Sequence, residues 1–155
     1  MNRKLTYSHE VYIAFPFRPF FCKFWKDPDI QNLEPHEKLL FAYLFTCEST
    51  TTSGIYPITP KTIAHETGVE LDVVKKFLSN GSFKSLAYDN ENNYVFVKGF
   101  KKYNKGGAPN IVKSGIVFDY EKSRCTGLWS LFVEYYPEYK EVITEVGKPK
   151  DFNGN

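Results

Sequence analysis

Between residues 33 and 80, apolar side chains recur every three or four positions in three separate runs. The first run follows Glu34-Pro35, a favourable helix start, and its apolar residues cover more than one side of the helix, which is typical of burial from several directions. The second run begins at Thr59-Pro60 and ends at Gly68, and the third extends from about Glu70 to Asn80. The pattern predicts three helices, the last two joined at a glycine corner.

Two further segments carry the pattern of β-strands. Gly54-Ile55-Tyr56-Pro57-Ile58 predicts a short edge strand, because Pro57 cannot donate to a ladder. Ser85–Tyr88 and Tyr94–Val97 flank a polar, turn-rich loop and predict a hairpin. The order helix, strand, helix, turn, helix, hairpin is that of a winged helix-turn-helix, a module that binds nucleic acid. We therefore predict an α+β fold that contains this module.

The remaining residues flank this module on both sides. We divide the chain into an N-terminal aromatic arm (1–32), a winged helix-turn-helix domain (33–105), a C-terminal helical extension (106–148) and a flexible tail (149–155). Residues 110–124 fit either a helix interrupted by Gly115 or strands, because many of them are β-branched. Residues 128–136 predict a helix that Pro137 ends.

Composition narrows the classes of protein that the chain can represent. Of 155 residues, 42% are hydrophobic and 17% aromatic, which argues against disorder. The formal charge of +2 suits neither a strong DNA clamp nor an acidic DNA mimic. Three widely spaced cysteines without a CxxC pair predict free thiols in a reducing compartment. With no apolar run long enough for a bilayer and no secretory signal, we expect a cytoplasmic protein that does not contact membranes.

Lysines supply the candidate DNA-binding residues. Lys75 and Lys76 project from the predicted third helix, where they either contact DNA or simply form a solvated helix face. The predicted wing and its exit carry a denser set, which suits phosphate binding in a groove or along a single strand. That set comprises Lys84, Lys98, Lys101, Lys102 and Lys105, with Asn104 among them.

Two other features bear on whether the predicted surface binds DNA or protein. Acidic residues near the start of the third helix, Glu70 and Asp72, repel phosphate, and Leu71 between them is expected to be exposed, which hints at a protein contact. Asn90, Asn92 and Asn93 at the hairpin tip have the reach for a minor groove, although polar hairpin tips are mostly turns.

An enzymatic function has little support in the sequence. Gly106-Gly107 lacks the Lys-Ser/Thr that follows the glycines of a phosphate-binding loop, and no motif surrounds a nucleophile. His9, His36 and His65 have no neighbour at metal-ligand spacing. We expect no catalytic activity, no cofactor and no metal.

Several short segments, in order, resemble the N-terminal region of phage replisome organisers and of DnaD-type replication initiation proteins. The resemblance covers residues 22–105 and does not extend to a DnaD-type C-terminal domain. It implies a winged helix that binds replication-origin DNA, duplex or single strand, or contacts a helicase loader or other replisome protein. The segments are Phe24–Ile30, Leu33–Phe41, Ser53–Ile58, Ile63–Gly68 and Val95–Asn104.

We therefore expect a DNA-binding protein of replication initiation. The alternatives are a protein-interaction module on a winged-helix scaffold without strong DNA binding, and a sequence-specific transcriptional repressor. The resemblance also implies self-association, and the surplus of aromatic residues points the same way. We expect a homodimer or higher oligomer with contacts mainly from residues 1–32 and 110–146.

Overall fold

The computed structural model describes residues 18–80, 84–100 and 107–147, and its elements form a mixed α+β fold. Residues 1–17 of the predicted arm and the predicted tail lie outside the described residues. The elements are η1 (Cys22–Lys26), α2 (Pro28–Gln31), α3 (Pro35–Thr46), β1 (Ile55–Pro57), α4 (Pro60–Thr67), α5 (Leu71–Ser79), β2 (Leu86–Asp89), β3 (Tyr94–Val97), α7 (Pro109–Lys122), α8 (Leu128–Tyr135), η2 (Pro137–Tyr139) and α9 (Lys140–Gly147).

Local signals in the sequence set the starts of α3 and α4. Before α3, the Glu34 backbone N–H donates to the Glu37 carboxylate at 3.0 Å, one half of a capping box. Before α4, the Thr59 hydroxyl accepts from the Thr62 backbone N–H at 3.1 Å. In both cases proline is the first helical residue, and the predicted helix starts are confirmed.

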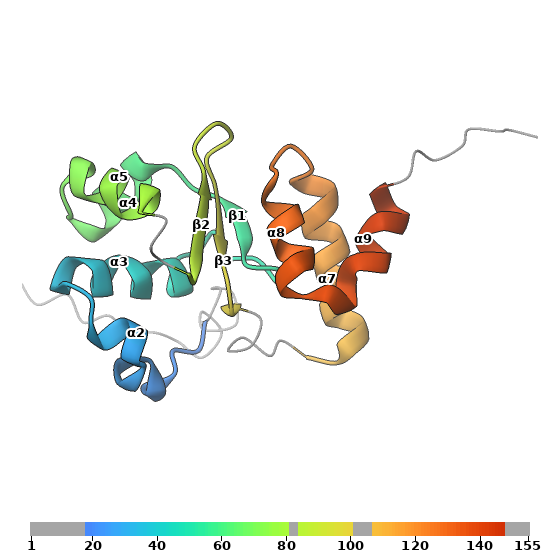
Figure 1. The fold of residues 1–155 in the computed structure, drawn as a ribbon, viewed down its shortest axis with the longest axis horizontal. Helices are drawn as coiled ribbons and strands as arrows, with labels where there is room; N and C mark the ends of the chain where they lie inside the picture. The colour runs from blue at the N-terminus through green and yellow to red at the C-terminus, as the bar shows by residue number, and fades with distance from the viewer. Residues whose placement is uncertain (1–17, 81–83, 101–106, 148–155) are drawn as a thin grey trace, which may run out of the picture.

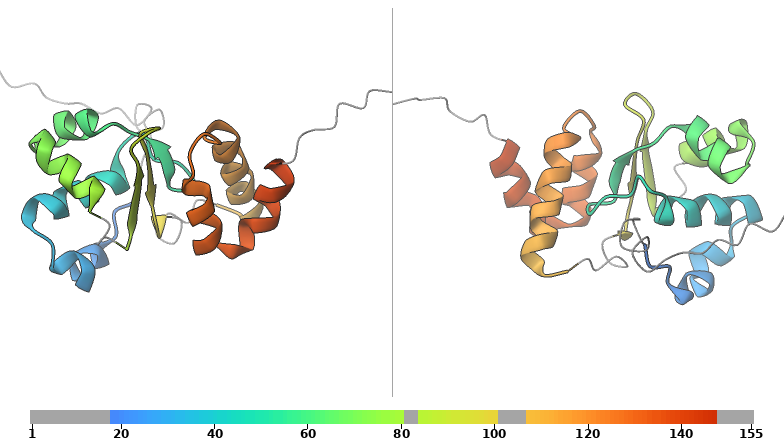
Figure 2. Two further views of the ribbon diagram at one scale, coloured as in Figure 1. Left: turned by 45° about the horizontal axis from the view of Figure 1, so that its top comes forward. Right: turned by 180° about the vertical axis from the view of Figure 1, so that it is seen from behind.

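The three strands form an antiparallel sheet in the order β1-β3-β2, so the proline-bearing strand β1 lies at an edge as predicted. Helices α3, α4 and α5 lie on one side of this sheet, and α7, α8 and α9 lie on the other (Figure 1, Figure 2). Successive side chains of a strand point to opposite faces, and β3 serves both layers. Val95 and Val97 enter the core on the α3 side, whereas Phe96 enters the core on the α8 side.

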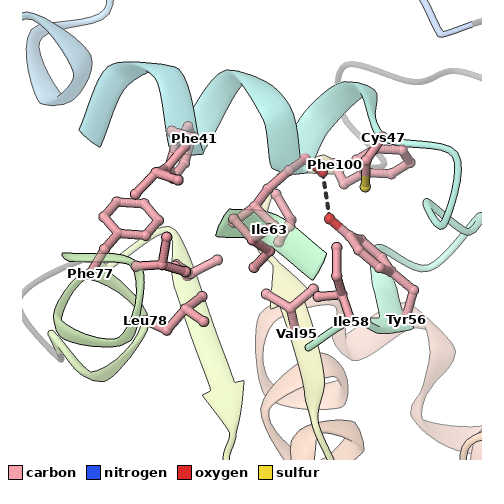
Figure 3. Close-up of a cluster of buried hydrophobic side chains, with 14 of the residues drawn as sticks. Phe41, Cys47, Tyr56, Ile58, Ile63, Phe77, Leu78, Val95 and Phe100 are labelled. Atoms are coloured by element: carbon pink, nitrogen blue, oxygen red, sulfur yellow. Dashed lines mark hydrogen bonds between the residues drawn. The ribbon is translucent and has the colours of Figure 1, made fainter. Parts of the chain in front are cut away.

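The core on the α3 side joins α3, α4, α5 and the sheet (Figure 3). Leu40 and Leu44 of α3, Ile63 of α4 and Val74 of α5 are almost completely buried. Tyr56 of β1 is buried with them, and its hydroxyl donates to the Leu44 carbonyl at 2.5 Å, which satisfies the polar end of the ring inside an apolar core.

The arm adds a small aromatic group beside this core. The Phe24 ring lies 6.2 Å from the Phe41 ring and 6.4 Å from the Phe45 ring, so the arm contacts α3. The helix α3 is thus covered by the arm as well as by the sheet and α4, which accounts for its apolar residues on several sides.

The core on the α8 side is built from the C-terminal helices. Phe96 and Ile55 of the sheet pack with Ile116, Trp129 and Phe132. Of the two possibilities for residues 110–124, the helix is correct, and α8 ends immediately before Tyr136-Pro137 as predicted. None of the helices within the described ranges is long and apolar enough to cross a lipid bilayer.

A glycine and an aspartate hold α7 against the loop before β1. A Cβ on Gly115 would come within 2.7 Å of the Thr52 hydroxyl, so the close approach requires glycine. The Asp119 carboxylate accepts from the Ser53 backbone N–H at 2.8 Å. Burial raises the pKa of Asp119, because the charged form loses its hydration.

Candidate nucleic-acid interface

Helices α4 and α5 meet at a left-handed corner. Gly68 has φ +73°, and its backbone N–H donates to the Ala64 carbonyl at 2.9 Å. Since a positive φ is easy only for glycine, this residue allows the chain to leave α4 and enter α5 within a few residues. The corner predicted at Gly68 is confirmed.

The exposed side of α5 carries both signs of charge. Val74, Phe77 and Leu78 are buried, and the opposite side, which we call the α5 face, exposes Asp72, Lys75, Lys76 and Ser79. The Lys75 Nζ lies 3.8 Å from the Asp72 carboxylate, and both side chains are mostly exposed. Such a surface ion pair contributes little to stability, but it leaves Lys76 as the less compensated cation of the face.

One expectation for this helix is wrong. Leu71 was expected to be exposed, but it is half-buried at the first position of α5, a helix that packs against α4. The acidic residues beside it, Glu70 and Asp72, are exposed as the sequence implies. The α5 face together with Glu70 therefore has no net positive charge.

Two more candidate lysines, Lys84 and Lys98, lie at the foot of the hairpin, meaning residues 84–85 and 98–99. The Lys98 backbone N–H donates to the Ser85 carbonyl at 2.9 Å, which extends the β2–β3 ladder past its last residue pair. Lys84 precedes Ser85 and is exposed, whereas Lys98 is half-buried. The other candidates, Lys101, Lys102, Asn104 and Lys105, lie outside the described residues.

The hairpin tip is bound to the rest of the protein. The Asp89 carboxylate accepts from the Thr126 hydroxyl at 2.6 Å and from the Asn92 side chain at 2.9 Å, and these bonds lower the pKa of Asp89. The Asn92 side chain also donates to the Cys125 carbonyl at 3.3 Å. Asn92 therefore holds the tip against the α7–α8 loop, which corrects the suggestion that it is available for a minor groove.

The sequence interpretation missed a cleft beside the hairpin foot. It has a volume of about 600 Å³ and lies between the arm, α3, the hairpin foot and the end of α8. Lys98 lines it together with Lys23 and Lys26 of the arm. A signal for this site exists in the sequence, where lysines alternate with aromatic residues over Phe20–Lys26.

Comparisons of the chain with protein-family models, with curated proteins and with solved structures give no match. In the parts of the chain that the structure describes, no group of three or more His, Cys, Asp or Glu side chains is placed to hold a metal ion. What the structure defines is an α+β protein with lysines on the α5 face, at the hairpin foot and around an aromatic cleft.

Proposed function

We propose that this chain is a DNA-binding protein of replication initiation, built on a winged helix-turn-helix. The observation that carries the proposal is the left-handed corner at Gly68 between α4 and α5, followed directly by the β2–β3 hairpin with β1 as the third strand. This succession of elements is typical of winged helices. The resemblance of residues 22–105 to phage replisome organisers supports a role at a replication origin.

In the proposed complex, α5 approaches the major groove and its lysines neutralise phosphates. The tip of the hairpin is acidic and is bound to the α7–α8 loop, so the wing contacts the backbone through Lys84 and Lys98 at its foot. Phosphate contacts position a protein without reading sequence. We accordingly propose DNA binding with modest sequence preference and no catalysis.

The test is a binding titration with a labelled duplex at several salt concentrations. Lys75→Ala combined with Lys76→Ala should weaken binding and lower the slope of log affinity against log salt by about two, since each lost phosphate contact removes about one. Lys113→Ala, an exposed lysine on α7 in the opposite helical layer, is the matched control and should change neither quantity. Unchanged affinity and slope in the double variant would remove α5 from the interface.

A second candidate function is a protein-interaction module, and the charge balance of α5 favours it. Glu70 and Asp72 offset Lys75 and Lys76, so a partner surface of mixed charge fits this helix as well as phosphate does. The same titration separates the two functions. Wild-type protein that binds neither duplex nor single strand at low salt would exclude DNA binding, and the helicase loader or another replisome protein would then be the expected partner.

A further inference from the structure

The cleft beside the hairpin foot is lined by both aromatic and basic side chains. Aromatic rings come from the arm and from the end of α8, with Phe20 and Tyr135 among the residues that line it. Phe20 retains 38% of its surface exposed and Tyr135 retains 50%. Large aromatic side chains left accessible inside a concave site usually mark a place where a ligand is bound.

Neighbouring rings hold both exposed aromatics in place. The Phe20 ring centroid lies 4.8 Å from that of Phe24, which packs against α3. The Tyr135 ring lies 4.8 Å from that of Tyr136 in an edge-to-face arrangement and 6.3 Å from that of Phe96. These contacts restrict both rings before a ligand arrives, which reduces the entropy lost on binding.

The charges around the cleft favour an anionic ligand. Lys23, Lys26 and Lys98 line it, and none of the three forms an ion pair with another described residue. Two carboxylates also line it, those of Asp27 and Asp29. The Asp27 carboxylate is already engaged, because it caps α2 by accepting from the Asp29 backbone N–H at 2.9 Å. With three lysines and two carboxylates, the lining carries a net charge of +1.

We propose that this cleft binds an unpaired segment of nucleic acid. Its bases stack on Phe20 and Tyr135, and its phosphates pair with Lys23, Lys26 and Lys98. A duplex does not fit this chemistry, since its base faces are covered by neighbouring base pairs. The volume of about 600 Å³ lies within the usual range of about 300–1,000 Å³ for ligand sites. The proposal shares Lys98 with the proposed duplex contact but does not depend on the α5 face, so variants of Phe20 and Tyr135 test it separately.

The test uses the full chain and short labelled oligo(dT) and oligo(U), with affinity measured by fluorescence anisotropy. Phe20→Ala and Tyr135→Ala should each weaken binding about 5- to 100-fold, the usual effect of losing one stacked base. Lys23→Gln with Lys26→Gln should lower the salt slope by about 1.4, at about 0.7 per contact on a single strand. Similar affinities for oligo(dT) and oligo(U) would show that base stacking dominates, whereas a strong preference would assign the natural strand to DNA or RNA.

Two controls keep the result specific to the cleft. Phe118→Ala removes an aromatic ring that is 54% exposed on α7, outside the cleft, and should leave oligonucleotide affinity unchanged. Lys113→Ala, which removes an exposed cation on α7 outside the cleft, should leave it unchanged too. The proposal is overturned if wild-type protein binds neither oligomer at low salt, or if the Phe20 and Tyr135 variants keep wild-type affinity while their thermal melts show folded protein.

Discussion

The corner at Gly68 permits a stability prediction whose size follows from the geometry. A Cβ added at Gly68 would meet no atom within 4 Å, so substitution introduces no clash. The φ of +73° remains, and a left-handed backbone costs an ordinary L-residue about 1–2 kcal/mol. Gly68→Ala should therefore lower the free energy of unfolding by that amount. In a chain of this length the loss corresponds to a fall of about 2–8 °C in Tm.

The assay is thermal unfolding followed by circular dichroism, with two further variants for comparison. Asn tolerates the left-handed region better than Ala, so Gly68→Asn should lose less stability than Gly68→Ala. Gly127 also has open space around its Cβ position, but its φ is −69°, so Gly127→Ala should stay within about 2 °C of wild type. The reasoning would be refuted if the Gly68→Ala protein melted at or above the wild-type Tm. It would also be refuted if the Ala and Asn variants had the same Tm.

Three further predictions concern the core, a buried carboxyl and assembly. Tyr56→Phe removes the hydrogen bond to the Leu44 carbonyl, which then has no buried donor. The free energy of unfolding, measured in urea, should fall by about 1–3 kcal/mol. No loss would mean that water replaces the hydroxyl. Because the pKa of Asp119 is raised, the stability that it contributes is complete below its ordinary pKa and is lost as pH rises through the folded value. The stability lost through Asp119→Asn, relative to wild type, should thus be smaller at about pH 7 than at about pH 4. Parallel pH profiles of the free energy of unfolding would contradict this. Sedimentation equilibrium should give a dimer or higher oligomer, and a constant mass near 18.0 kDa up to high micromolar concentration would exclude it.

The parts of the fold that follow from neighbouring residues could be predicted from the sequence. Thr59-Pro60 and Glu34-Pro35 set helix starts through bonds to residues three positions away, and Gly68 ends α4 through its own backbone conformation. Local signals failed for α7, because β-branched residues at helical spacing fit two structures equally well. The close approach of Gly115 to Thr52 is likewise invisible to local signals, because it exists only once the chain is folded.

The candidate site was less predictable, because its parts come from distant segments. The bond from Ser53 to Asp119 spans 66 positions of the sequence and that from Thr126 to Asp89 spans 37, and no spacing rule indicates them. The cleft likewise joins the arm to the hairpin foot and to Tyr135. Individual lysines could be proposed from charge alone, but which of them share a surface depends on the tertiary packing.

The central strand has a consequence for how the protein can be divided. Strand β3 places Val95 and Val97 in one core and Phe96 in the other. Removing the helices from one face of the sheet therefore exposes side chains of the strand that also supports the other core. A chain cut after residue 105 would keep α3, α4, α5 and all three strands, yet it would expose Phe96 and Ile55 to water. We therefore expect that residues 33–105 do not fold as a separate module, and that both helical layers unfold in one cooperative transition.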